Sequence, residues 1–505
     1  GRAMFDFEEL ERRDSRSSQK MIDPITLKAI AMKIRHRARR VTFLTNSKDM
    51  VADVLPTEQA LLPKCIGQST SSSRGSARSP AESDLSVLSV LSGPDNIEGL
   101  KTIFVHPFSL LLVACPLGIM AKWQDWGDTW TFWLNFVALV PLAKILGDGT
   151  EELAAGLAND TVTGLLNATF GNAVEMIVTI FSLKRGLIYI VKTSLLGSVL
   201  SNMLLVLGTA FFLGGLTRSQ AQRGKYHMFN NDEWDATSRF EKEQKFAIKA
   251  AMVSMAMLLF ACMSMALPTI FSAYPSDDSK NVLVVSRIGA LIVMSSYVAL
   301  LVFQLGTHKK TLTKEEADVG GSSHMSFNEK EEEEEDQDEG PGITVRCALF
   351  LMFITTAVVS LNSEYLVDSI EQIVANNGIP GNFVGVILLP IAGNACEHAC
   401  AIRVAMDDRP ILAVGIAVGS STQVSLLVVP FAVAMGWIMD QPMDMNFGVL
   451  NVGVMTMSVL TLVVILIDGR ANWLKGYILV CLYVFIAVLY WYVPDASSLR
   501  TGPGA

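Results

Sequence analysis

Long apolar blocks separated by short polar connections run from residue 103 to residue 493. A helix needs roughly 20 apolar residues to cross about 30 Å of hydrocarbon, and about eleven blocks meet that requirement. The blocks lie near residues 103–121, 129–147, 160–183, 189–213, 246–270, 281–305, 343–362, 380–404, 410–436, 448–467 and 472–493. This pattern predicts an all-α membrane protein with about 11 transmembrane helices.

The composition agrees with this pattern. Of the 505 residues, 50% are hydrophobic and 18% are charged, and the mean hydropathy is +0.39. These values exclude an ordinary soluble protein and a disordered chain. The charged residues crowd into 1–101, 217–249 and 306–346, so the formal net charge of −9 says little about partners. We expect a lipid bilayer and small cations as partners, and no nucleic acid; the sequence says nothing about the oligomeric state.

The distribution of Lys and Arg predicts the orientation in the membrane. The N-terminal segment carries "KIRHRARR" at 33–40 and the loop 217–249 carries seven Lys and Arg, whereas the loops near 363–380 and 437–447 carry none. Alternation through eleven spans then places the N-terminus in the cytosol and the C-terminus outside or in a lumen. The Lys-Arg pair at 184–185 disagrees with this orientation.

Three polar segments lie outside the predicted spans. Residues 1–100 are predicted to form a disordered cytosolic tail without the apolar core of a signal peptide. The tail contains "RRDS" and "RRVT", patterns that basophilic protein kinases phosphorylate, although a plain solvated tail is the alternative. Residues 306–342 form an acidic cytosolic linker whose run "EKEEEEEDQDE" indicates a solvated connection or, alternatively, a role in cation collection or regulation. Residues 496–505 form a short terminal tail.

The chain contains seven cysteines whose spacing does not match a disulfide framework. We interpret them as reduced packing residues. Cys396 and Cys400 stand four residues apart, which is also a spacing for a soft-metal site. No further cysteine lies near them in the sequence, so packing is favoured over metal binding.

A repeat relates two parts of the chain. When 171–173 are aligned with 393–395 and the alignment is extended without a gap, Glu175 falls on Glu397 and Ser201 falls on Gln423. We interpret this repeat alignment as two homologous five-helix repeats, 129–305 and 343–495, preceded by an extra helix within 101–128. Because five is odd, the second repeat enters the membrane upside down relative to the first. Transporters with such inverted repeats bind their substrate near the bilayer midplane, between the repeats.

The repeated segment places an acidic residue within each of two predicted spans. A carboxylate at bilayer depth is costly and usually marks a transport pathway. On a helix, Asn172 shares a face with Glu175, and Asn394 shares a face with Glu397. Two carboxylates and two amide oxygens form the start of an all-oxygen site, which suits a hard divalent cation such as Ca²⁺. Glu175 and Glu397 are the predicted metal ligands.

Neighbouring residues add to this predicted site. Gly171 and Gly393 allow close backbone approach, and Pro390 disrupts its helix and frees carbonyl oxygens. Ser201 and Gln423 either line the site or pack helices together. His398 has no counterpart in the first repeat; a hydrogen-bonded interior histidine is favoured over a proton relay.

These motifs in combination resemble those of the cation/proton exchanger family, the vacuolar Ca²⁺/H⁺ antiporters, within the calcium/cation antiporter superfamily. The resemblance covers roughly residues 100–495 and is carried by "GNAVE", "SLLGSVLSNMLLVLG", "GNACEHA", "VGSSTQVSLLVVP", "LNSEYL" and "DGRANWLKG". It implies that Glu175 and Glu397 are essential for transport. It also implies an acidic segment between the repeats. Cys396 and Cys400 depart from the family pattern, in which small residues are familiar.

The resulting expectation is a secondary active transporter that exchanges Ca²⁺, or Mn²⁺, for H⁺ across a vacuolar or other acidic endomembrane, with no enzymatic activity and no cofactor. Ca²⁺ and protons would compete for the paired glutamates at the midplane. A Na⁺-coupled Ca²⁺ exchanger is one alternative, although a proline and more hydroxyls are expected beside its carboxylates. A divalent-cation channel is another. An intramembrane metalloenzyme built on Glu397 and His398 is disfavoured because no HExxH pair of histidines is present.

Overall fold

The computed structural model describes residues 96–157, 166, 169–217, 242–273, 279–311 and 342–494. All of them belong to one compact unit, Pro94–Ala505. The kinase motifs, most of the predicted N-terminal tail, most of the acidic linker and the terminal tail lie outside the described residues. The tail was predicted to extend to residue 100, but a helix begins at Asn96.

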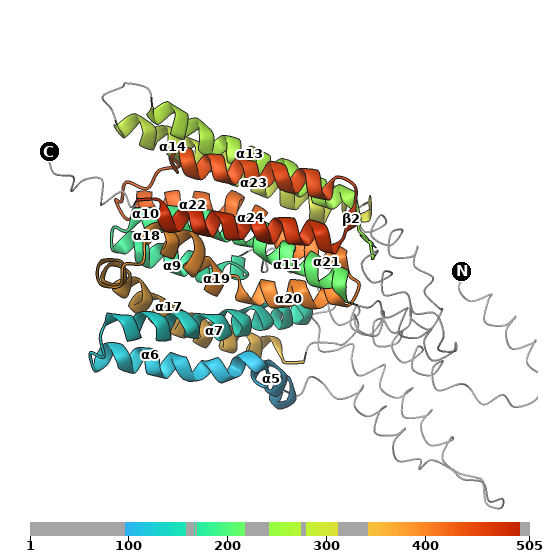
Figure 1. Ribbon diagram of the computed structural model, residues 1–505. Helices are drawn as coiled ribbons and strands as arrows, with labels where there is room; N and C mark the ends of the chain where they lie inside the picture. The colour runs from blue at the N-terminus through green and yellow to red at the C-terminus, as the bar shows by residue number, and fades with distance from the viewer. Residues whose placement is uncertain are drawn as a thin grey trace, which may run out of the picture. The chain divides into compact units, whose positions relative to one another are not determined.

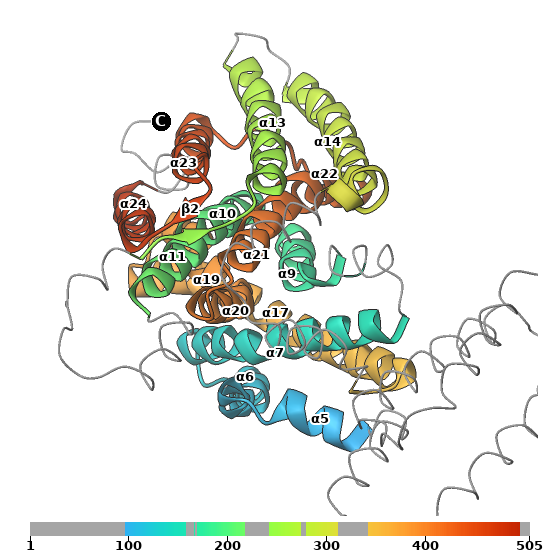
Figure 2. The same ribbon diagram turned by 90° about the vertical axis from the view of Figure 1, so that its right-hand side faces the viewer.

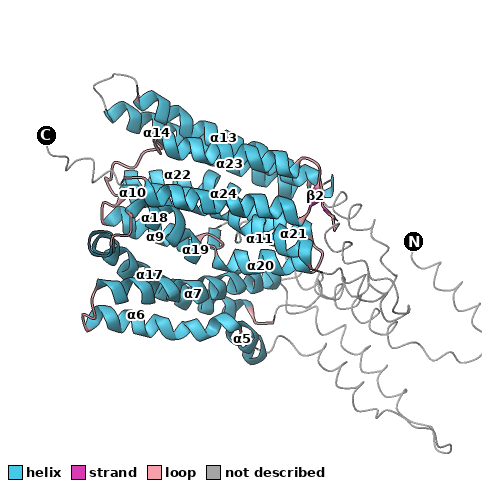
Figure 3. Ribbon diagram, in the orientation of Figure 1, coloured by secondary structure: helices cyan, strands magenta, loops and turns pink. Residues whose placement is uncertain are grey.

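The described residues form an almost entirely helical structure (Figures 1 and 3). The first part contains α5 Asn96–Phe104, η2 Pro107–Val113, α6 Ala114–Trp123, α7 Asp128–Leu157, α9 Ala173–Lys184, α10 Ile188–Leu200, η3 Ser201–Val206, α11 Leu207–Leu216, α13 Ile248–Ser272, α14 Ser279–Leu301 and η5 Val302–Thr307. The second part contains α17 Val345–Asn377, α18 Gly381–Phe383, η6 Val384–Leu388, α19 Leu389–Gly393, α20 Ala395–Met406, α21 Pro410–Gln423, η7 Val424–Val428, α22 Val429–Ile438, α23 Val449–Leu466 and α24 Trp473–Tyr492. Two short antiparallel strands, β1 Gln244–Lys245 and β2 Arg470–Ala471, pair with each other.

Within the described residues, eight helices are long and apolar enough to cross a membrane, and the number rises to ten if each of two bent pairs is one span. One pair, Asn96–Phe104 with Phe108–Trp123, bends by 84°, and the other, Gly381–Gly393 with Ala395–Met406, bends by 59°. The predicted all-α membrane architecture is thus confirmed. The predicted span 160–183 is described mainly at its end, by α9, so the count of about eleven stays a prediction.

Lipid-facing surfaces account for the apolar side chains that the structure leaves exposed. Phe353 on α17 is 75% exposed, Leu291 on α14 is 61% exposed and Phe485 on α24 is 70% exposed. In water such a large apolar surface would be unstable. In a bilayer it is the expected outer face of helices whose backbone groups are satisfied internally.

The helix boundaries follow the repeat found in the sequence. The gapless repeat alignment carries both ends of α9 onto those of α20, and both ends of α11 onto those of α22. The same alignment carries the start of α10 onto the start of α21, and the π-helical segments η3 and η7 coincide within one residue at their starts. The similarity therefore extends from residue types to local backbone conformation.

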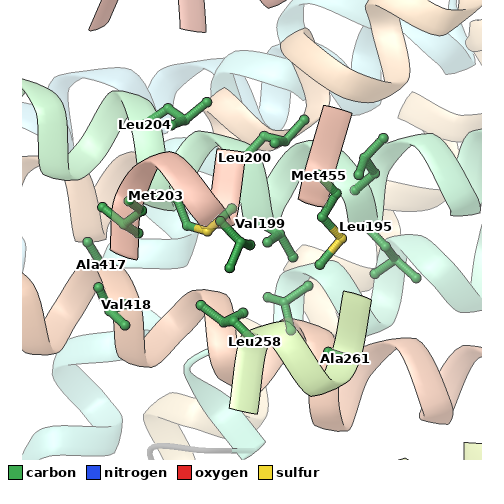
Figure 4. Close-up of a cluster of buried hydrophobic side chains, with 14 of the residues drawn as sticks. Leu195, Val199, Leu200, Met203, Leu204, Leu258, Ala261, Ala417, Val418 and Met455 are labelled. Atoms are coloured by element: carbon green, nitrogen blue, oxygen red, sulfur yellow. The ribbon is translucent and has the colours of Figure 1, made fainter. Parts of the chain in front are cut away.

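The packing brings the two parts together in the centre of the unit. Figures 1 and 2 show α6, α7 and α17 on one side of a central group that includes α9, α10 and α19 to α21, with α13, α14 and α23 on the other side. Figure 4 shows part of the largest apolar cluster, where Leu195 and Val199 of α10 meet Leu258, Val418 and Met455 from α13, α21 and α23.

Two glycines allow the backbones of α10 and the α18–α19 region to touch. A Cβ on Gly197 would lie 2.2 Å from the carbonyl oxygen of Val386, and a Cβ on Gly385 would lie 1.9 Å from Oγ1 of Thr193. No side chain larger than hydrogen fits at such distances without movement of the backbone. This crossing holds the segment around Pro390 against α10.

Candidate functional site

Each Gly-Asn-Ala segment interrupts a helix at its asparagine. Asn172 has φ −110° and ψ 22°, and α9 begins at the next residue; Asn394 has φ −92° and ψ 12° between α19 and α20. The sequence placed each asparagine and its glutamate on one face of a helix and expected a disruption at Pro390; the structure breaks both helices at the asparagines. Glu175 and Glu397 therefore lie in the first turn of a new helix. Unpaired N–H groups and the helix dipole favour a negative charge there.

The two asparagine side chains bond across to helices of the other part. Neither caps its own helix, and both are 2% exposed. Nδ2 of Asn172 donates to Oε1 of Gln423 on α21 at 2.8 Å. Asn394 accepts from Oγ of Ser198 on α10 at 3.2 Å and donates to the Ser198 carbonyl at 3.2 Å. The break before α9 is therefore bonded to α21, and the break before α20 is bonded to α10.

These contacts identify a residue that the sequence analysis missed. The sequence singled out Ser201, and not Ser198, as a residue that either lines the site or packs helices together. Ser198 contacts Asn394 and lines the cavity described below, whereas Ser201 is 1% exposed at the start of η3 and is not among the lining residues. The role of Ser201 stays a prediction, and Gln423 takes part through Asn172.

A small cavity of about 30 Å³ lies beside Glu175. A volume of this order holds one or two water molecules or a partly dehydrated ion. Its walls come from α7, α9, α10 and α19, and comprise Leu139, Val174, Glu175, Val178, Ser194, Leu195, Ser198, Leu389, Pro390 and Gly393. The cavity is therefore bounded by both parts of the chain.

Gly393 brings its backbone against the carboxyl group of Glu175. A Cβ at this position would lie 2.7 Å from Oε1 of Glu175. The predicted close approach is present at Gly393, and Gly171 is exposed. The carbonyl that Pro390 leaves without a helical partner belongs to Val386. That oxygen faces Gly197 at the helix crossing, where it supports the packing.

The two glutamates lie on segments that touch each other, because Glu175 contacts Gly393, which stands four residues before Glu397. Both side chains are partly buried, and Oε2 of Glu397 is enclosed without a hydrogen-bond partner among the described residues. Neither carboxylate forms an ion pair with another described residue. Enclosing carboxylates without such partners costs several kcal/mol.

The polar side chains that join the two broken helices to their partners offer oxygen atoms as ligands. Within the described part of the chain, no group of three or more His, Cys, Asp or Glu side chains is arranged to hold a metal. The candidate ligands for a cation are therefore the two carboxylates, together with amide and hydroxyl oxygens from Asn172, Asn394 and Ser198. Such neutral oxygens are common ligands of Ca²⁺, which accepts six to eight of them including water.

His398 points toward α11 and lies within hydrogen-bond distance of a hydroxyl. Its Nε2 is 2.7 Å from Oγ1 of Thr209. This matches the interior, hydrogen-bonded histidine that the sequence favoured, and a role as proton relay stays a prediction. In η3, Nδ2 of Asn202 donates to Oγ of Ser420 at 2.9 Å, which adds a polar contact between η3 and α21.

The chain is similar to a known family of membrane proteins. Residues 128–306 and 347–492 match the family described as "Sodium/calcium exchanger protein". Vacuolar cation/proton exchanger 2 of Arabidopsis thaliana is 36% identical over 445 residues, which covers 88% of this chain and 91% of that protein. The Ca(2+)/H(+) antiporter of Synechocystis sp. is 37% identical over 393 residues, which covers 77% of this chain and 97% of the antiporter.

Two solved structures have a similar fold. Native YfkE superimposes with a TM-score of 0.59 and 30% sequence identity, covering 76% of this chain and 100% of YfkE. The H+/Ca2+ exchanger CAX superimposes with a TM-score of 0.52 and 12% identity, covering 77% of this chain and 88% of CAX. The second likeness concerns the fold alone.

Proposed function

Since the chain belongs to the sodium/calcium exchanger protein family, we propose that it is a secondary active transporter that exchanges Ca²⁺ for H⁺ across a vacuolar or other acidic endomembrane. The names of its relatives, a vacuolar cation/proton exchanger and a Ca(2+)/H(+) antiporter, support this substrate pair. The "Vacuolar calcium ion transporter" of Schizosaccharomyces pombe, 37% identical over 405 residues, supports the same compartment.

The observation that carries the proposal is the pair of unpaired glutamates in the centre of a helical membrane unit. With Ca²⁺ bound, Glu175 and Glu397 are both ionised and the cation offsets their charge. After Ca²⁺ leaves toward the acidic side, protons neutralise them. The empty, doubly charged site is disfavoured by desolvation and by the repulsion between the two carboxylates. Because only the loaded and the protonated sites cross between access states, the two fluxes are coupled.

The proposed architecture is one extra N-terminal helix followed by two five-helix repeats of inverted topology. The matching boundaries of α9 with α20 and of α11 with α22 support the repeat. The cross-bonds from Asn172 to α21 and from Asn394 to α10 support a site between the repeats. In such transporters the ends of broken helices meet the substrate near the midplane, which agrees with the breaks at both asparagines. The proposed orientation has the N-terminus in the cytosol.

The donor set favours hard divalent cations, namely Ca²⁺ and Mn²⁺. Protons are favoured over Na⁺ as the counter-ion because the segments around both glutamates contain Gly-Asn-Ala, without the proline and additional hydroxyls expected beside a Na⁺ site. A channel would conduct Ca²⁺ without a pH gradient. Coupling to the gradient is therefore the property that separates the two mechanisms.

The test is Ca²⁺ uptake into proteoliposomes that contain the full-length chain and an imposed pH gradient. We expect uptake of Ca²⁺ driven by an acidic interior, and its loss in Glu175→Gln and in Glu397→Gln, because each amide removes a charge and a proton-binding site. Glu371→Gln is the matched control, since Glu371 is exposed on α17 away from the cavity. Robust uptake by either site variant would overturn the mechanism, and uptake without a gradient would indicate a channel.

Mn²⁺ and Na⁺ offered separately in the same vesicles define the substrate range. We expect Mn²⁺ to compete with Ca²⁺ for uptake. An outward Na⁺ gradient alone should drive no Ca²⁺ uptake. If Na⁺ replaces the proton gradient at equal driving force, the chain is a Na⁺-coupled exchanger instead.

A further inference from the structure

Two neighbouring thiols accompany Glu397 on α20. Cys396 and Cys400 are free cysteines, four residues apart on this helix. The repeat alignment superimposes them on Val174 and Val178, which are two of the residues that line the cavity in the first part. The dithiol therefore occupies, in the second part, the positions that face the ion site in the first.

The geometry of a regular helix prevents these thiols from forming a disulfide without distortion. Side chains at i and i+4 have Cβ atoms about 5–6 Å apart. A disulfide requires a Cβ separation of about 3.5–4.5 Å. A single atom inserted between the two sulfurs bridges the wider gap, so the pair is arranged to hold a thiophilic ion.

The surroundings select the kind of ion. No third His, Cys, Asp or Glu ligand joins the pair in the described part of the chain, which disfavours four-coordinate Zn²⁺. Thiolates prefer soft cations such as Cu⁺, which accepts two ligands in a linear arrangement. Cys400 is exposed.

We propose that Cys396 and Cys400 form a second cation site that takes one soft, two-coordinate cation of the Cu⁺ class, and that its occupancy inhibits the exchanger. Each thiol releases its proton as its sulfur bonds the cation. The bound cation lies within one helical turn of Glu397, where its charge opposes Ca²⁺. It also lies at the contact between α20 and α7, since Cys396 faces Gly147. The inhibition rests on the proposed exchange, whereas the binding does not.

The test uses Ag⁺, a redox-stable cation with the coordination preference of Cu⁺, in chloride-free buffer. Bound Ag⁺ per full-length protein is measured directly, and Ca²⁺ uptake is measured over the same Ag⁺ concentrations. We expect one tightly bound Ag⁺ and inhibition over the same range. Because the second sulfur binds intramolecularly, Cys396→Val or Cys400→Val should weaken both effects by about 100-fold. Valine is the residue at the equivalent positions of the first part, so it fits the local packing.

Cys481→Ala is the control, because Cys481 is an exposed free cysteine on α24. It should leave Ag⁺ binding and inhibition unchanged. Wild-type affinity in either valine variant, or loss of binding in the control, would overturn the proposed site. Binding at the dithiol without inhibition would overturn the inhibitory role. If the wild-type chain takes up no Ca²⁺ at all, the exchange proposal fails while the Ag⁺ measurement still decides the site. Alanine variants of both cysteines replace any valine variant that does not fold.

Discussion

Gly393 offers the sharpest test of the site geometry. In Gly393→Ala the new Cβ would lie 2.7 Å from Oε1 of Glu175, whereas ordinary contact begins at 3.4 Å. The carboxyl group must therefore retreat by about 0.7 Å from its position beside the cavity. Since this group is the end of a flexible side chain, the fold should tolerate the change. On the proposed mechanism Ca²⁺ binding should weaken, because Oε1 of Glu175 is one of the proposed ligands.

The magnitude follows from the displacement. In positioned sites a misplacement of about 1 Å costs up to about 100-fold in activity. A retreat of about 0.7 Å therefore predicts a loss of roughly tenfold in apparent Ca²⁺ affinity, which corresponds to about 1.4 kcal/mol. The half-saturating Ca²⁺ concentration for gradient-driven uptake measures this loss, and thermal unfolding of the purified protein checks that the variant is folded.

Gly419→Ala is the matched control, because no atom lies within 4 Å of a Cβ placed there. It should retain both affinity and stability. If folded Gly393→Ala shows the wild-type Ca²⁺ affinity, then Ca²⁺ binding does not depend on the position of the Glu175 carboxyl group beside the cavity. That result would refute the reasoning.

Three further predictions concern stability and pH. Gly197→Ala should lower the melting temperature and the yield of folded protein, because its Cβ would lie 2.2 Å from a backbone carbonyl of η6. An unchanged melting temperature would contradict the close contact between α10 and η6. Thr209→Val removes the hydroxyl at 2.7 Å from His398, so stability should fall by about 1–3 kcal/mol with an unchanged pH profile of uptake; a shifted profile would instead indicate a proton relay. Burial alone raises the pKa of Asp468, but hydrogen bonds from Lys475 outweigh it and hold the pKa below its usual value. The stabilisation by this half-exposed pair is therefore present at neutral pH and is lost as the pH falls through the lowered pKa. Asp468→Asn should lower the free energy of unfolding at pH 7 and leave it equal to that of the wild type in acid. An equal difference at both pH values would contradict this reasoning.

The membrane architecture and the family were predictable from the sequence. Apolar blocks of sufficient length predicted the helices, and the two segments around Asn172 and Asn394 suggested the family that the comparisons then confirmed. The repeat alignment also anticipated the matching boundaries of α9 and α20. These features depend on residue type and spacing alone.

The local geometry was not predictable in the same way. Asparagine is only a weak helix breaker, so the breaks at Asn172 and Asn394 were invisible without the tertiary bonds that hold their side chains. The place of Ser198 beside Asn394 was not predictable for a related reason. A π-helix begins at Ser201, and such a segment changes the rotation per residue, so an α-helical face cannot be extrapolated through this point.

The contact between α10 and the α18–α19 region limits how the site can open. Main chains that meet at Gly197 and Gly385 cannot slide along each other, because every shift drives a carbonyl or a threonine hydroxyl into a Cα. We therefore expect the two elements to move together, so that access to the proposed site would change through movement of the helices around them. A bound ion would then keep nearly the same position while the helices on its two sides move alternately.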